Sequence, residues 1–121
     1  MPQSHKDLII WKKTMELVTE TYQEILKFPK EEVYGLTSQI RRSAVSTPSN
    51  IAEGKGRRSS KEFRQFLTQA RGSLGELETQ IQIAENLGYL EIVGCERLKS
   101  KASELGKMLN GFLEAVAVRK Q

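Results

Sequence analysis

Apolar residues recur at alternating intervals of three and four along most of this 121-residue chain, and this spacing is the strongest constraint on its fold. The pattern occurs in four segments, from Leu8 to Ile25, Val33 to Ile51, Phe63 to Ala84 and Ile92 to Val116. Residues spaced in this way share one face of an α-helix. No segment alternates apolar and polar residues as a half-buried strand does. The sequence therefore predicts an all-α protein.

The ends of these segments carry signals that start or stop helices. Phe28-Pro29 ends the first helix, because the residue before a proline avoids the helical conformation. Ser59 and Glu62 have the spacing of a capping box, and Gly88 supplies a stop for the third helix. Short connections between helices of roughly 20 residues or more favour antiparallel neighbours. The predicted fold is a single domain over residues 1–121, an antiparallel up-down-up-down four-helix bundle.

In the first segment, the residues predicted to face the core are the apolar ones with the three-and-four spacing. They are Leu8, Trp11, Met15, Val18, Tyr22 and Ile25. Charged residues such as Lys12, Glu16 and Glu20 fall on other faces of this helix.

Pro48 lies inside the second segment, within the polar run Ser46-Thr47-Pro48-Ser49-Asn50. A proline inside a helix removes one backbone donor and clashes with the carbonyl four residues before it, at a cost of about 3 kcal/mol unless the helix bends. Neighbouring hydroxyl and amide side chains can bond the freed backbone groups. Because the apolar spacing continues through Pro48, we expect one bent but unbroken helix from about Val33 to Glu53. Two interpretations of this kink are open. It lets the helix curve around the core, or it exposes backbone carbonyls and hydroxyl groups to a partner.

Positive charge is concentrated between Thr37 and Gly72. That stretch has eight basic and two acidic residues, whereas the rest of the chain has 11 basic and 13 acidic residues. The net charge of +4 therefore arises from one helical hairpin, which is typical of a surface that binds a polyanion. The predicted nucleic-acid-binding residues are Arg41, Arg42, Lys55, Arg57, Arg58, Lys61, Arg64 and Arg71. Arg57 and Arg58, at the junction of two helices, are expected to be the most exposed. A solvated surface without a ligand is the alternative.

One face of the third helix carries small residues. At 100° per residue, Thr68, Gly72, Gly75 and Thr79 lie opposite the apolar stripe. A glycine inside a helix costs on the order of 1 kcal/mol relative to alanine, so two glycines on a solvated face indicate close approach by another helix. The sequence predicts that these four residues form a homo-oligomer interface. Glycines that are merely tolerated at the surface are the alternative.

The chain lacks the residue sets that common catalytic and metal sites require. His5 is the only histidine, in an N-terminal segment expected to fray, and Asp7 and Cys95 are the only aspartate and cysteine. A nucleophile, a base and an orienting group cannot be assembled from these residues in the usual way, and no Cys/His cluster for zinc is present. Cys95 lies on an apolar stripe and is expected to be a buried, unreactive thiol. We expect no catalytic residues, no metal, no cofactor and no enzyme activity.

Hydropathy bears on the location of the protein. No apolar run approaches the roughly 20 residues that a membrane span needs. The N-terminal residues, from Met1 to Asp7, contain no apolar signal segment. The expectation is a cytoplasmic protein with no membrane partner.

A set of motifs lies between Tyr34 and Gln80: Tyr34 to Ser46, Pro48 to Gly54, Glu62-Phe63, Phe66-Leu67, Gly72-Ser73 and Glu76 to Gln80. Together they resemble the four-helix proteins encoded within intervening sequences of bacterial 23S ribosomal RNA genes, and the resemblance covers nearly the whole chain, most specifically positions 34 to 87. Thr47 departs from that pattern, where isoleucine is commoner. The resemblance implies a compact antiparallel bundle, assembly into a ring-like homopentamer, and a cytoplasmic, bacterial origin.

A related branch of proteins extends what the resemblance implies. The accessory variability proteins of diversity-generating retroelements form similar basic pentamers that bind nucleic acid and a reverse transcriptase. This chain resembles the intervening-sequence branch more closely. A reverse transcriptase is therefore a partner only by remote analogy.

Two functions agree with the sequence. The first is an oligomeric nucleic-acid-binding protein that contacts the phosphates of structured RNA through the second-to-third helix hairpin. Because the basic stretch lacks interleaved aromatic residues, little recognition of bases is expected. The second is a protein-interaction scaffold, without enzyme activity, whose basic face binds an acidic protein.

Overall fold

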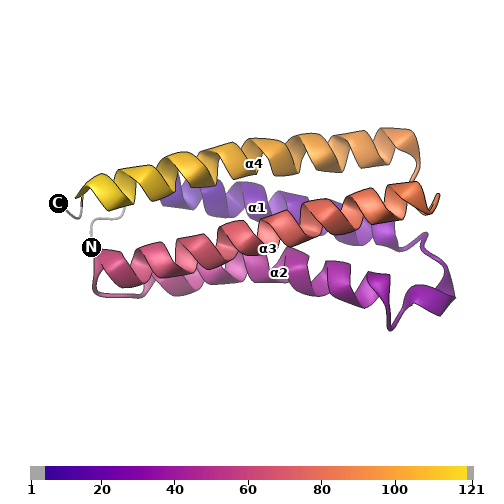
Figure 1. Ribbon diagram of the computed structural model, residues 1–121, viewed down its shortest axis with the longest axis horizontal. Coiled ribbons are helices and arrows are strands. Elements are labelled where there is room, and N and C mark those ends of the chain that lie inside the picture. Colours follow the sequence, from indigo (N-terminus) through magenta and orange to yellow (C-terminus); the bar gives the residue numbers. More distant parts are fainter. Residues whose placement is uncertain (1–4, 120–121) are drawn as a thin grey trace.

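The computed structural model describes residues 5–119, which form four long α-helices and one short 3₁₀ helix. They are α1 (His5–Ile25), η1 (Lys30–Glu32), α2 (Leu36–Lys55), α3 (Ser60–Asn86) and α4 (Ile92–Arg119). Figure 1 shows the long helices side by side along one axis, with the α2–α3 connection at the same end as the start of α1 and the end of α4. Residues Met1 to Ser4, which bear on the predicted lack of a signal segment, lie outside the described residues.

Contacts between the helices confirm the predicted bundle. Each long helix contacts the next one in sequence, and α1 also contacts α4. Ser43, in the first half of α2, bonds Gln80 near the end of α3, whereas Gly54 at the end of α2 lies against Phe66 near the start of α3. Neighbouring helices run in opposite directions (Figure 1). No helix within residues 5–119 has the length and hydropathy needed to cross a membrane.

The predicted core stripes of α3 and α4 are nearly all buried. In α3 they are Phe63, Leu67, Ala70, Leu74, Leu77, Ile81 and Ala84. In α4 the stripe is buried from Cys95 to Val116, but Ile92 is 73% exposed. Ile92 is the first residue of α4, at the turn that follows α3.

The predicted core stripe of α1 is confirmed at Ile25 but is displaced by one residue from Leu8 to Tyr22. The positions that face the core are Asp7, Ile10, Thr14, Leu17, Thr21, Glu24 and Ile25. Of the stripe predicted to be buried, Leu8 and Met15 are each 40% exposed and Tyr22 is 37% exposed. Trp11 and Val18 are only partly buried. The helix therefore has a core-facing stripe and a second, outward-facing apolar stripe beside it.

Threonine can occupy the core side of α1 because its hydroxyl is satisfied within the helix. Thr14 Oγ1 donates to the Trp11 carbonyl oxygen at 2.7 Å, and Thr21 Oγ1 donates to the Leu17 carbonyl oxygen at 2.7 Å. A buried hydroxyl without a partner would be costly. With these hydrogen bonds, both threonines can be fully buried.

The helix α2 is unbroken through Pro48, as expected, but it begins at Leu36 instead of Val33. The Glu32 carboxylate fixes this start, because its Oε1 accepts a hydrogen bond from the Leu36 amide at 3.0 Å. That bond, followed by the one from the Tyr89 hydroxyl, lowers the pKa of Glu32. Val33 is left in the connection before α2, 41% exposed.

The polar residues around Pro48 are used inside the bundle. Thr47 Oγ1 donates to the Ser43 carbonyl oxygen at 3.0 Å, and Asn50 Nδ2 donates to the Ser46 carbonyl oxygen at 2.9 Å. The Ser46 hydroxyl is 2.8 Å from the hydroxyl of Ser73 on α3. The polar run therefore supports the α2 backbone and its contact with α3, which favours the view that it fits the core.

Candidate nucleic-acid interface

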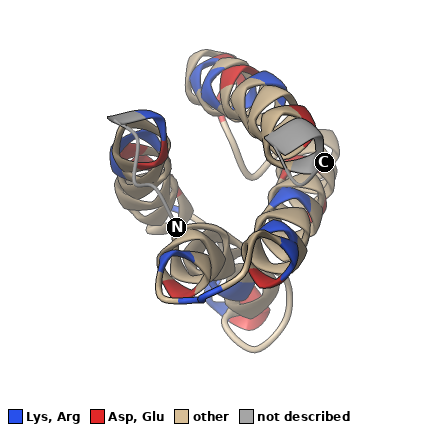
Figure 2. Ribbon diagram, turned by 90° about the vertical axis from the view of Figure 1, so that its left-hand side faces the viewer, with Lys and Arg blue, Asp and Glu red and all other residues tan. Residues whose placement is uncertain are grey.

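The structure divides the eight predicted nucleic-acid-binding residues into three groups. Five of them surround the α2–α3 connection at one end of the bundle (Figures 1 and 2). These five, which we call the basic end, are Lys55, Arg57, Arg58, Lys61 and Arg64. Arg41 and Arg42 lie in the first half of α2, roughly 20 Å from Lys55 at 1.5 Å per residue. Arg71 lies further along α3.

The local structure explains why the basic end is compact. The helix α2 ends at Lys55, where the Gly56 amide donates to the Glu53 carbonyl oxygen at 3.2 Å. Ser59 then caps α3, because its Oγ accepts a hydrogen bond from the Glu62 amide at 3.1 Å. The predicted capping signal is thus confirmed, and a connection of four residues holds the two helix ends close together. Only two carboxylates, Glu53 and Glu62, lie between Thr37 and Gly72.

Arg57 is less exposed than expected. It forms an ion pair with Glu53, and its guanidinium carbon lies 4.7 Å from the centroid of the Phe66 ring. These contacts leave its side chain 39% exposed, whereas Arg58, Lys61 and Arg64 are exposed. Stacking on an aromatic ring holds the planar guanidinium in one orientation. Of the pair predicted to be most exposed, only Arg58 meets the prediction.

Ion pairing differs between the two halves of the bundle. On the α1–α4 side, Arg97 contacts Glu24 at 3.0 Å and Glu20 at 3.3 Å, and Lys101 also pairs with Glu20. Among residues 5–119, six cations on the α2–α3 side form no ion pair. They are Arg41, Arg42, Lys55, Arg58, Lys61 and Arg64. Their charge is available to an external anion.

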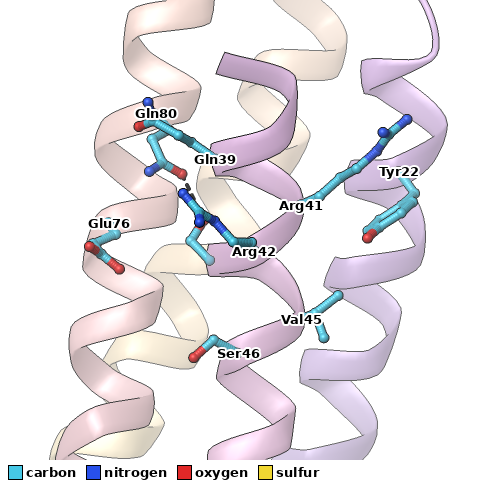
Figure 3. Close-up of a pocket in the computed structure, with 9 residues that line it drawn as sticks. Tyr22, Gln39, Arg41, Arg42, Val45, Ser46, Glu76 and Gln80 are labelled. Atoms are coloured by element: carbon cyan, nitrogen blue, oxygen red, sulfur yellow. Dashed lines mark hydrogen bonds between the residues drawn. The ribbon is translucent and has the colours of Figure 1, made fainter. Parts of the chain in front are cut away.

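Arg41 and Arg42 lie at an open hollow of about 670 Å³ between α1, α2 and α3. Figure 3 shows Arg42 on the α3 side of this hollow, near Gln39 and Gln80, and Arg41 on the α1 side, near Tyr22. The guanidinium carbon of Arg41 is 5.7 Å from the centroid of the Tyr22 ring. These two arginines therefore diverge, and the structure does not bring them together with the basic end.

Two aromatic residues lie beside arginines of the basic stretch. Tyr22 of α1 contacts Arg41 of α2, and Phe66 of α3 contacts Arg57. Phe66 itself lies within the basic stretch, between Arg64 and Arg71, so the expectation that this stretch lacks interleaved aromatic residues is wrong. Only the packing of α1 against α2 brings Tyr22 to this surface, and no local sequence signal would have shown it.

Arg71 links α3 to α4 and does not join the basic end. Its Nε donates to Asn110 Oδ1 at 3.1 Å, and its Nη1 lies 3.8 Å from Glu78 Oε1. Its guanidinium also covers Gly106, where an added Cβ would lie 3.4 Å from Nη2. These contacts show that Arg71 contributes to the packing of the protomer. A role in binding nucleic acid is not needed to explain why an arginine stands at this position.

The predicted oligomer interface residues share the outer face of α3. Thr68, Gly72 and Thr79 are exposed and Gly75 is half-buried. A Cβ added at Gly72 would meet nothing within 4 Å, and one at Gly75 would meet only Arg71 of the same helix, at 3.8 Å. No other described helix of the protomer requires these glycines. Assembly through this face stays a prediction.

Within residues 5–119, no group of three His, Cys, Asp or Glu side chains is placed to hold a metal ion. Cys95 is fully buried in the core. Burial, followed by the hydrogen bond and the charge of Glu85, raises the pKa of Cys95 to about 11. The thiol therefore stays protonated at neutral pH.

We expect Cys95 in the native protein to resist a thiol reagent such as dithionitrobenzoate at pH 8, and to react once denaturant is added. A free cysteine has a pKa of about 8.5, so the unfolded chain loses this proton before the folded chain does. The thiol's contribution to stability is complete below about pH 8.5 and is lost as the pH rises toward 11. Rapid labelling without denaturant would contradict the burial of Cys95.

Comparisons with known proteins agree with this bundle. The sequence profile of the family described as "23S rRNA-intervening sequence protein" matches residues 6–111. A crystal structure from Bacteroides thetaiotaomicron, described as a protein with unknown function from the S23 ribosomal protein family, has a similar fold with a TM-score of 0.82. The two chains are 21% identical over 90% of this chain and 98% of the other. No curated protein matched the sequence. With the profile matching most of its length, the chain belongs to the 23S rRNA-intervening sequence protein family.

Proposed function

We propose that this protein is a cytoplasmic, oligomeric nucleic-acid-binding protein that uses its basic end to contact structured RNA. The observation that carries the proposal is the group of unpaired cations around the α2–α3 connection. Arg58, Lys61 and Arg64 are exposed and form no ion pair within residues 5–119. The family name, which refers to 23S rRNA, supports RNA over DNA as the ligand.

The chemistry of the basic end suits the phosphate backbone. Arg58 and Arg64 can each bond two phosphate oxygens through the planar guanidinium, while Lys61 acts as a point charge. Lys61 and Arg64 line an open surface hollow together with Thr68. An open surface allows contact with a folded RNA from outside but does not enclose a base. We therefore infer that the protein recognises phosphate positions and RNA shape, and that it acts by binding and not by catalysis.

Assembly would multiply these contacts. In a homo-oligomer, each protomer adds one copy of the basic end, and tethered weak contacts act at a high effective concentration. The family resemblance favours a pentamer. A ring of this kind would bind a large folded RNA more tightly than it would bind a short hairpin that reaches only one protomer.

A second candidate function rests on the same unpaired cations. An acidic protein surface could pair with Arg58, Lys61 and Arg64 as well as phosphates could, which would make the protein a scaffold. A reverse transcriptase is one such protein partner, proposed by remote analogy alone. A competition experiment compares the two candidates. Both ligands would bind the basic end, so structured RNA and an acidic protein would have to displace each other from it.

The proposed function can be tested by titrating a labelled structured RNA at several salt concentrations. We expect log affinity to fall linearly with log salt, and Arg58→Ala to reduce the slope by about 1 because one phosphate contact is lost. Lys12→Ala, which removes an exposed cation on α1, is the matched control and should leave the slope unchanged. Failure of the native protein to bind any RNA or DNA at low salt would exclude the proposal and favour the scaffold.

A further inference from the structure

The outward-facing apolar stripe of α1 is only partly covered within the described protomer. At 100° per residue its side chains fall within an arc of about 80°. They are Leu8, Trp11, Met15, Val18 and Tyr22. Three of them are between 37% and 40% exposed, and Trp11 and Val18 are half-buried. A regular three-and-four stripe of large apolar residues is the surface that one helix presents to another. Contiguous exposed apolar patches of this kind mark interaction sites.

The outer face of α3 is a second helix face without a partner, and its shape is complementary to the stripe. Thr68, Gly72, Gly75 and Thr79 are small, and Ile83, 42% exposed, continues the same face. Large residues on one helix fit against small residues on another because the two backbones can approach closely. We propose that the α1 stripe of one protomer packs against the α3 face of a second copy. This inference rests on the homo-oligomer of the proposed function and identifies its interface.

The two faces are matched in length and level. From Leu8 to Tyr22 and from Thr68 to Ile83, each face is roughly 21 to 23 Å long at 1.5 Å per residue. Within one protomer α1 and α3 run in the same direction (Figure 1). Phe28 and Tyr89, each three residues beyond the end of its helix, are in contact with ring centroids 5.4 Å apart.

This register fixes which residues meet if neighbouring copies are related by rotation about an axis parallel to the bundle. Such a rotation keeps every residue at its own level. Trp11 then faces Gly72 and Val18 faces Thr79, so these two large side chains of α1 each meet a small one of α3, and Met15 lies level with Glu76, beside Gly75. Tyr22 meets Ile83 at the end of the interface.

A contact between two different faces generates a ring when the rotation closes. Each protomer then uses its α1 stripe toward one neighbour and its α3 face toward the other. Because the rotation axis is parallel to the bundle, all basic ends lie on the same side of the ring. The arrangement thus produces the repeated cationic surface on which the proposed multivalent binding depends.

The experiment measures the native mass of the protein by light scattering at micromolar concentration. We expect Leu8→Glu with Met15→Glu to reduce the mass from that of a ring to that of a protomer, with unchanged helicity because both positions are exposed. The matched control is Ile92→Glu with Val93→Glu, at two sites that are each 73% exposed and outside both faces. The control should keep the mass of the native protein.

Cross-linking tests which faces meet. A Met15→Cys, Gly75→Cys double variant should form, on oxidation, a ladder of covalent oligomers that ends at the closed ring, and its last band gives the number of protomers. Either single variant should give no covalent dimer, whereas dimers of Met15→Cys alone would indicate that two α1 stripes meet and would overturn the proposal. Native protein of protomer mass would overturn the inference and the oligomer together. An oligomeric mass that survives Leu8→Glu with Met15→Glu would overturn only the interface, and RNA titration tests the basic end separately.

Discussion

Replacing Arg57, Arg58, Lys61 and Arg64 with glutamate should reduce the affinity for structured RNA on the order of a thousandfold near 0.1 M salt. Each phosphate contact changes log affinity by about 0.9 per tenfold change in salt, so the loss of the three unpaired cations, Arg58, Lys61 and Arg64, accounts for most of a loss of this size. The substitutions also place four carboxylates beside Glu53 and Glu62, which repel phosphate. Titration of labelled RNA by anisotropy, after a check of helicity and mass, measures the effect.

The control for this variant must separate local charge from net charge. Changing Lys12, Lys27, Lys30 and Lys107 to glutamate alters the net charge by the same amount but leaves the basic end intact; all four side chains are exposed. We expect this control to lose far less affinity than the first variant. Equal losses would show that the RNA responds only to overall charge, and unchanged affinity in the first variant would exclude the basic end.

Gly54→Ala should destabilise the fold by about 1 to 3 kcal/mol, the usual cost of adding atoms to a filled core. Gly54 lies where α2 packs closely against α3. A Cβ there would lie 2.9 Å from Phe66 Cβ and 3.0 Å from Phe63 Cδ1. Phe66 Cβ is held by the α3 backbone, so the helices themselves must separate. Denaturant unfolding monitored by circular dichroism gives the free energy.

Gly111→Ala is the matched control for this prediction. Gly111 is an exposed residue inside α4, and a Cβ there would meet nothing within 4 Å. Because alanine favours the helix over glycine, the same substitution should stabilise the protein by up to about 1 kcal/mol. If both variants changed stability in the same direction, the close packing at Gly54 would not be the cause.

Spacing alone predicted the architecture and most of the core, because α3 and α4 each carry one apolar stripe. It failed for α1, where two stripes lie one residue apart. Spacing predicts that the stripe with the larger apolar residues, including Leu8 and Met15, faces the core, but the structure buries Thr14 and Thr21. Sequence periodicity gives the width of an apolar face. Which part of a wide face turns inward depends on the neighbouring helices.

The candidate site was predictable only in part. The density of charge in the chain identified the basic end, since Lys55 to Arg64 are close in sequence and needed only a short connection to be close in space. The sequence could not show that Arg71 lies apart from the basic end, because its partner Asn110 is on another helix. The contact between Tyr22 and Arg41 likewise depends on tertiary packing.

Both ends of the described chain lie beside the basic end, and this affects how labels and fused domains should be attached. The first turn of α1 and the last turn of α4 reach the same end of the bundle as the α2–α3 connection (Figure 1). A bulky domain joined before residue 5 or after residue 119 would crowd an RNA there, and an affinity tag rich in histidine would add charge. Gly88, exposed and with a φ of 78°, marks the turn between α3 and α4 at the opposite end. A fluorophore or an inserted peptide at that turn would report on binding from the far side of the molecule without obstructing it.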